Sequence, residues 1–285
     1  MGDIMDRHVM EALGKAKVII ENGKIVEVTE PKIKYCPLFA KHRGIKEITK
    51  ESIKENIEFR IKDFGLFTKN RIVEEDKFIV PFGASEILMS ALKRKVVDVA
   101  VIVSDCAGTV ITANPNLVQG LCGRISGIVE TSPILEVIEK IEKAGGIVLN
   151  KKTAEINQFE GVKKAIELGY KRIAVTLTNL EDAKKCKSLE NDEIKILTFG
   201  VHLTEIEESK EIAKYFDLVT ACASKVLREK LKGKIKAQIG KTIPIFALSD
   251  FGKEILLERA KDLDNILITI EDLPALSDNQ PKPLI

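Results

Sequence analysis

Five cysteines and three histidines are the side chains of this sequence best suited to bind a soft metal or to act as nucleophiles and bases. The cysteines are far apart in the chain: Cys36, Cys106, Cys122, Cys186 and Cys222. An odd, widely spaced set in 285 residues argues against a secreted disulfide framework and favours thiols or metal ligands. Thiolates bind soft ions and iron–sulfur clusters, so the sequence is compatible with a transition metal or such a cluster as cofactor, whose identity it leaves open.

The segment YCPLFAKHRG places Cys36 and His42 six residues apart, beside Lys41 and Arg43. A Cys and a His at this spacing could supply two ligands of a metal, but a metal site needs three or four and no CxxC accompanies them. We therefore expect further ligands from elsewhere in the fold. The predicted metal set is Cys36, His42, Cys106 and Cys222.

Cys222 lies in TACASK, at the start of a predicted helix, where free amides and the neighbouring Ser224 and Lys225 would favour a thiolate. Cys106 lies in SDCAGTVIT, where Gly108, followed by Thr109, would let a ligand approach the backbone; a simple tight turn explains this segment equally well. A buried, inert cysteine is the alternative for both thiols. Cys186, on a lysine-rich helix, is expected to be inert.

The segment NPNLVQGLCGRISGIVETSP, residues 114–133, reads as a long loop interrupted by glycines. Its glycine, arginine and serine groups could cradle an anion such as phosphate or carboxylate; flexible connection is the alternative. The residues concerned are Gly120, Gly123, Arg124, Ser126 and Gly127. Their spacing matches neither a dinucleotide fingerprint nor a P-loop.

From Pro81 onward, apolar strands alternate with amphipathic helices, which predicts an α/β fold with a doubly wound, mostly parallel sheet. Strands are expected at 96–103, 145–149, 172–177, 194–200, 217–221, 243–248 and 265–270. Helices are expected at 84–94, 132–143, 158–168, 180–189, 205–214, 222–231 and 250–261.

In such a sheet, ligands bind beyond the carboxyl ends of the strands. This rule selects the residues that follow each strand: Ser104, Asp105, Cys106, Thr176, Thr178, His202, Thr220, Cys222, Ser224, Ser249 and Asp250. Ser249 and Asp250 are also ordinary helix caps. The catalytic candidates are Cys222, Cys36, His202 and Asp105, and the cofactor-binding candidates add Gly108, Thr109, Ser224 and Lys225 to the glycine-rich loop.

Residues 1–80 are expected to form a small N-terminal α+β lobe, residues 81–270 the core domain and 271–285 a polar tail. The lobe should contain a short helix from Asp6 to Lys15 and a tight hairpin at Asn22-Gly23. A helix from Lys50 to Phe64, capped by Thr49, should follow the basic Cys/His loop.

The formal net charge is only +2, which predicts no attraction to nucleic acid or to an anionic membrane. The sequence contains no run of about 20 apolar residues, and its start lacks the apolar core of a signal peptide. A cytoplasmic protein is therefore expected.

At YCPLFAKHRG, SDCAGTVIT, NLVQGLCGRISGIV, QFEGVKKAIELGYKRIAVT and VTACASK the sequence resembles the methanogenesis marker protein 8 family of archaea. The resemblance runs from about Asp6 to Lys261 and implies a cytoplasmic protein that makes, activates or services the methane-forming machinery. Compared with the family pattern, Cys36 and Cys222 fit better than Cys106 and Cys122.

The leading hypothesis is an enzyme or maturation factor that handles a sulfur, metal or cofactor species at the carboxyl edge of the sheet. Two alternatives remain open. One is a non-catalytic partner in a methyl-coenzyme M reductase-related assembly, and the other is a metal-free binder of a small anionic molecule.

Overall fold

The computed structural model describes residues 6–36, 39–40, 43–125, 127–203, 209–221, 224–240 and 244–266. His42, Ser126, Cys222, most of the predicted strand 265–270 and the tail lie outside these ranges. Within them, no helix is long and apolar enough to cross a membrane.

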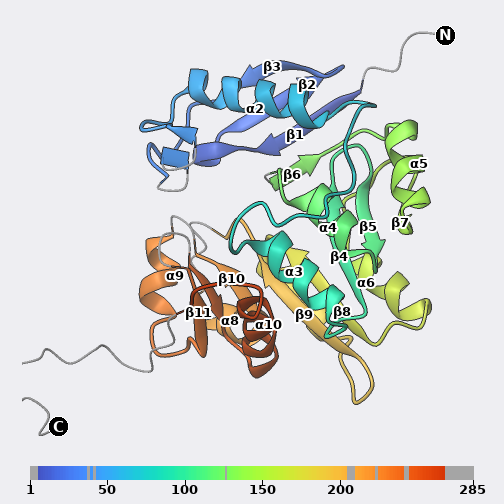
Figure 1. Cartoon of the computed structure of the whole chain (residues 1–285), viewed down its shortest axis with the longest axis vertical. Coiled ribbons are helices and arrows are strands. Elements are labelled where there is room, and N and C mark those ends of the chain that lie inside the picture. Colours follow the sequence, from blue (N-terminus) through green and yellow to red (C-terminus); the bar gives the residue numbers. More distant parts are fainter. Residues whose placement is uncertain are drawn as a thin grey trace, which may run out of the picture.

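A small antiparallel sheet of order β3-β2-β1-β6 forms the N-terminal lobe (Figure 1). Its strands are β1 (Arg7–Glu11), β2 (Lys17–Glu21), β3 (Lys24–Val28) and β6 (Gly127–Glu130). The predicted hairpin is confirmed: β2 and β3 pair across Asn22 and Gly23, whose φ angles of 48° and 71° are those of a type I′ turn. The small sheet thus takes its edge strand β6 from far along the chain.

The predicted helix from Asp6 to Lys15 is wrong. Residues Arg7–Glu11 form β1, which pairs on both sides, with β2 and with β6, and only a 3-10 turn η1 (Leu13–Lys15) follows. The segment is too short for its pattern of apolar residues to separate a strand from a helix, and the pairing partner β6 lies more than a hundred residues away.

Helix α2 (Lys50–Phe64) has the predicted bounds and the predicted cap. The Thr49 hydroxyl accepts a hydrogen bond from the Ser52 amide, and Gly65, with a φ of 67°, ends the helix. Ile53 and Ile57 are buried in the apolar cluster between α2 and the small sheet. Burial of that face holds the helix on the sheet.

The large sheet has the order β11-β12-β10-β9-β8-β4-β5-β7. Its strands are β4 (Val99–Ser104), β5 (Gly108–Thr112), β7 (Gly146–Val148), β8 (Arg172–Leu177), β9 (Lys195–Gly200), β10 (Leu218–Thr220), β11 (Ala237–Ile239) and β12 (Ile245–Ala247). The central strands β10, β9, β8 and β4 are parallel, whereas the pairs at both edges are antiparallel. The α/β class is confirmed, but the expectation of a mostly parallel sheet is not, because the sheet is mixed.

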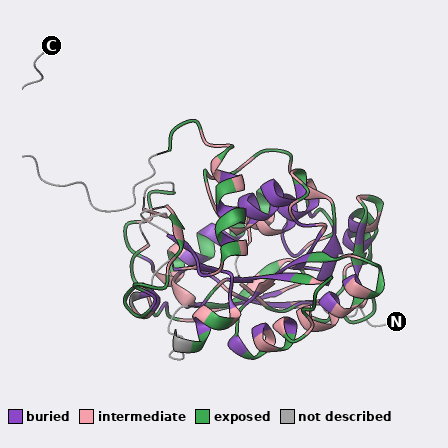
Figure 2. Cartoon of the chain, turned by 90° about the horizontal axis from the view of Figure 1, so that it is seen from below, coloured by how far each residue is buried: buried purple, intermediate pink, exposed green. Residues whose placement is uncertain are grey.

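Helices cover both faces of the large sheet, and Figure 2 shows the buried layer between them. One face packs against α3 (Ala84–Lys93), α4 (Pro115–Cys122), α5 (Leu135–Lys143) and α10 (Asp250–Ala260). The other packs against α6 (Gln158–Glu167), α7 (Leu180–Lys187), α8 (Ser209–Tyr215) and α9 (Lys225–Lys230). Alternation along β4 explains this: Ala100 and Ile102 face the first layer, and Val99 and Val101 the second.

The glycines of segment 114–133 predicted a long loop, and this prediction is wrong. The segment contains α4 and β6. Asn114 caps α4 through its side chain, and Pro115 occupies the first helical position. Strand β6 then leaves the core and pairs with β1. This crossing joins the two sheets; the predicted boundary near residue 80 stays a prediction.

Candidate functional site

The carboxyl ends of two central strands meet the small sheet (Figure 1). Beyond β9, His202 contacts Glu11 of β1, and beyond β4, Cys106 is linked to His8 of β1 through Thr131. Strand β1 therefore contacts the edge at which the parallel strands end. In open α/β folds this is the edge where ligands bind.

His202 and Glu11 form a polar pair between the two sheets. His202 Nδ1 lies 3.3 Å from Glu11 Oε1, and both side chains are about one-third exposed. His202 has a φ of 56°, and a Cβ at Gly127 would lie 3.4 Å from its ring. The hydrogen bond with His202 lowers the pKa of Glu11, against the opposing effect of burial. Such a carboxylate can orient an imidazole as a base or ligand.

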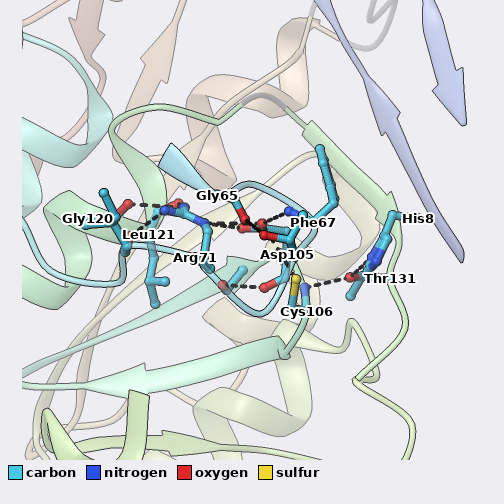
Figure 3. Close-up of polar contacts among 12 residues, drawn as sticks. His8, Gly65, Phe67, Arg71, Asp105, Cys106, Gly120, Leu121 and Thr131 are labelled. Carbon is cyan, nitrogen blue, oxygen red and sulfur yellow. Dashed lines mark hydrogen bonds and ion pairs between the residues drawn. The ribbon is translucent and has the colours of Figure 1, made fainter. Parts of the chain in front are cut away.

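Asp105 is completely buried at the carboxyl end of β4 (Figure 3). Its carboxylate accepts hydrogen bonds from Arg71 Nε at 2.9 Å and from the Phe67 amide at 2.8 Å. The Arg71 guanidinium also donates to the carbonyls of Gly120 and Leu121, both at 3.1 Å. The pair is buried, and the N–H groups of Arg71 donate to protein oxygens. It therefore holds the chain around Phe67 and Arg71 against the end of β4 and does not face a substrate.

Cys106 occupies the turn after β4 with a φ of 66°. Its amide donates to Thr131 Oγ1 at 2.8 Å, and that hydroxyl lies 2.7 Å from His8 Nδ1 (Figure 3). Burial lowers the pKa of His8, and His8 Nε2 has no hydrogen-bond partner among the described residues. The neutral imidazole thus lies in the seam between β1 and the β4–β5 turn.

The pKa values of three thiols are unsuited to a thiolate site. Burial raises the pKa of Cys106 well above its usual range, and the Asp105 carboxylate adds to this effect. Burial likewise raises the pKa values of Cys122 and Cys186 to about 12. A thiol whose pKa is raised by burial is a poor nucleophile. Because a bound metal deprotonates its thiol ligands, Cys106 as a metal ligand stays a prediction.

The remaining predicted residues have structural contacts. Gly108 has a φ of 71°, and a Cβ there would lie 2.1 Å from the Ala154 carbonyl; the Thr109 hydroxyl accepts from the Asn157 amide. Both positions therefore anchor the chain between β7 and α6.

The glycine-rich segment is packed. A Cβ at Gly120 would lie 2.2 Å from the Val73 carbonyl, and one at Gly123 2.6 Å from the Gln119 carbonyl. Arg124 is paired with Glu75 at 2.5 Å. The two glycines thus allow close backbone packing, and anion binding by this segment stays a prediction.

At the end of β10, Ser224 caps α9 by accepting from the Leu227 amide, and Lys225 begins that helix. The buried hydroxyl of Thr220 has no hydrogen-bond partner among the described residues. Helix α9 is only six residues long, so the dipole expected to favour a thiolate at Cys222 is small.

Ser249 and Asp250 lie at the opposite edge from the one expected. Because β12 runs antiparallel to β10, they follow its end beside Asp217, where the Ser249 hydroxyl donates to that carboxylate.

Cys36 is half-buried in the apolar cluster of the N-terminal lobe, whereas Cys106 belongs to the core cluster under α3 and α4. Among the described residues, no three His, Cys, Asp or Glu side chains are grouped as a metal site would require. His42 and Cys222 lie outside these residues, so the predicted metal set stays a prediction.

Sequence reasoning missed Glu11, Arg71 and Thr131. Each acts through a partner far away in the chain, and no local motif marks them. A prediction of Arg7–Glu11 as a strand would have placed Glu11 at the end of that strand. Glu11 could then have been identified as a candidate site residue.

The fold and site define a class: a mixed-sheet α/β protein whose small antiparallel sheet contacts the carboxyl ends of the parallel strands through a carboxylate–imidazole pair. The chain belongs to the family described as an uncharacterized protein conserved in archaea (DUF2099), matched over residues 8–261.

An uncharacterized protein of Methanocaldococcus jannaschii is 90% identical over 281 residues, covering 99% of this chain and 100% of that protein. Among solved structures, the F420-reducing NiFe hydrogenase complex from Methanosarcina barkeri is similar at 12% identity and a TM-score of 0.34, over 63% of this chain and 72% of that one. A likeness at this level carries no argument.

Proposed function

We propose that this protein is an enzyme or maturation factor that handles a sulfur, metal or cofactor species at the carboxyl edge of its large sheet. The His202–Glu11 pair carries the proposal, because it places a partly exposed imidazole, oriented by a carboxylate, at the end of β9. His202 acts there as a base or ligand.

One further feature at the same edge supports this assignment, and the sequence adds another. The Thr220 hydroxyl at the end of β10 is buried without a hydrogen-bond partner among the described residues, so a bound molecule could use it. Cys222 follows two residues later in the chain. Because burial raises the pKa values of the Cys106, Cys122 and Cys186 thiols, the proposal gives the thiol role to Cys222 and Cys36.

The finer biological role belongs to the same proposal. The sequence resemblance to the methanogenesis marker protein 8 family supports a role in making or servicing the methane-forming machinery. An anaerobic context suits thiolate ligation of soft metals and iron–sulfur clusters.

The test is analysis of metal and acid-labile sulfide in protein purified without oxygen, for the wild type and for Cys222→Ala. Cys186→Ala is the matched control, because that thiol lies on α7 and is buried in the apolar core, away from the proposed edge. The proposal expects metal or sulfide that Cys222→Ala loses and Cys186→Ala keeps. Folded wild-type protein with neither would remove the metal and sulfur chemistry from the proposal.

A further inference from the structure

His8 is a completely buried histidine at the junction of the small sheet and the core (Figure 3). It lies on β1, and its Nδ1 is 2.7 Å from the Thr131 hydroxyl, which accepts a hydrogen bond from the Cys106 amide at 2.8 Å. The Phe67 ring lies beside the imidazole, with the two ring centroids 5.2 Å apart. Segments from four parts of the chain therefore meet around one imidazole.

The hydrogen bonds at this junction suit a neutral imidazole. A neutral ring carries one N–H, and its Nδ1 can either donate to the Thr131 hydroxyl or accept from it. His8 Nε2 is buried and has no hydrogen-bond partner in the described part of the chain. A protonated ring carries an N–H on both nitrogens, so it would add a buried charge and an Nε2 donor that no neighbouring group accepts.

No carboxylate is placed to compensate a charge on His8. Three carboxylates face it, from the start of β1, the turn after β4 and strand β6: Asp6, Asp105 and Glu130. Each is already held by another group: Asn22, Arg71 and Arg7, respectively. Burial is the larger effect and lowers the pKa of His8 in spite of these charges.

We propose that His8 is an acid-sensitive latch between the small sheet and the core: protonation of its imidazole opens the junction while both sheets stay folded. Opening brings the charged ring into water, which satisfies both N–H groups. Glu11 lies on β1 with His8, so the same movement parts Glu11 from His202. The latch thus acts on the edge where the proposed site lies, and it does not depend on the chemistry proposed for that site.

The proposal predicts the direction of the pH dependence. An exposed imidazole titrates near pH 6.5, whereas the closed junction holds the ring neutral below that pH. The open state therefore binds a proton that the closed state does not. The junction should be fully stable above about pH 7 and lose stability as the pH falls below about 6.5, with opening favoured up to about tenfold per pH unit.

The test is hydrogen exchange of the full chain at about pH 7.5 and about pH 5.5, resolved at single amides by NMR and expressed as protection factors. The Phe67 and Cys106 amides are the junction amides, because they donate to Asp105 and Thr131. Their protection should fall by about tenfold at the lower pH. The Ala174 amide, in the interior strand β8, should keep its protection.

Variants assign the effect to one histidine. His8→Phe keeps a ring against Phe67 but takes up no proton, so the fall in protection should vanish. His8→Asn, whose amide can still bond to the Thr131 hydroxyl, gives the same readout if circular dichroism shows that His8→Phe does not fold. His202→Gln is the matched control, because His202 also contacts β1, and this variant should keep the fall.

Three results overturn the proposal. The first is unchanged protection of the junction amides in the wild type. The second is an equal fall in β8, which would mean that acid loosens the whole protein. The third is a fall that persists in the His8 variants or that His202→Gln abolishes.

Discussion

At the scale of single residues, the buried Arg71–Asp105 pair is expected to matter most for stability. Asp105→Asn keeps the shape of the side chain but leaves the Arg71 charge buried without its anion, at a cost of about 3–5 kcal/mol in the free energy of unfolding. Urea denaturation measures this cost. Glu130→Gln breaks the exposed Arg7–Glu130 pair and should cost far less, because solvent screens that pair. Similar costs for the two would contradict the structural role of Asp105.

The cysteines should differ in reactivity. The raised pKa values and burial of Cys106 and Cys186 predict that iodoacetamide at pH 8 does not modify them in the folded protein. Half-buried Cys36 should be modified first among the cysteines that the structure describes. Mass spectrometry of digests, with urea-unfolded protein as the control, follows each site. Rapid modification of Cys106 before unfolding would show that its turn opens.

Sequence reasoning found some of these residues and missed others for a physical reason. Asp105, Cys106 and His202 follow strands, and the alternation of strand and helix is local, so the sequence could identify them. Their partners Arg71, Thr131 and Glu11 are 34, 25 and 191 residues away in the chain. Contacts at such separations depend on the folded topology, which the sequence does not display.

At the scale of elements, the β4–β5 turn depends on Gly108. Gly108→Ala would place a Cβ against the Ala154 carbonyl in a left-handed conformation, and we expect a loss of roughly 3 kcal/mol or more in stability. Gly145→Ala is the matched control: its φ is +83° but nothing lies within 4 Å, so strain alone should cost about 1 kcal/mol. Urea denaturation compares the two. Equal losses would mean that the close approach to Ala154 is absent.

Helix α10 is held to α3 by Asp262, and this contact predicts a pH dependence. Hydrogen bonds from Arg94 and Ser90 lower the pKa of Asp262 to about 2. Because the folded pKa lies below the unfolded value near 3.9, the contribution to stability is complete above about pH 5 and is lost as the pH falls toward 2. Asp262→Asn should therefore cost about 1–2 kcal/mol at pH 7 and almost nothing near pH 2.

Urea denaturation across this pH range measures the Asp262 contribution, and the exposed Asp264→Asn is its control. A pH-independent difference between the wild type and Asp262→Asn would contradict the ion pair.

Elements with a local signature were predicted well. The Asn22-Gly23 turn, the Thr49 cap of α2 and the apolar run of β8 at Arg172–Leu177 carry their own signals. Strands β5 and β11 and helix α4 were missed. Strand β11 is a three-residue edge strand, and β5 follows directly after the turn that contains Cys106. The glycines of α4 concealed a helix whose cap, Asn114-Pro115, could have revealed it.

At the scale of the whole molecule, the sequence indicates two layers of helices around a sheet but not the direction of each strand. Strand direction depends on which strands pair in the folded chain. The antiparallel pairing of β5, β7, β11 and β12 at the edges could therefore not be predicted from the local pattern. The pairing of β6 with β1 is equally non-local. These pairings bring the small sheet to the carboxyl edge, where the lobes share the His202–Glu11 contact.

That contact is the central claim, and the pKa of the Glu11 carboxyl measures it most directly. In the wild type, carbon-detected NMR titration should give a Glu11 pKa below the usual value, because His202 hydrogen-bonds to it. In His202→Ala, burial remains but the hydrogen bond is lost, so the pKa of Glu11 should rise. A Glu11 pKa that His202→Ala leaves unchanged would contradict a site built jointly by the small sheet and the core.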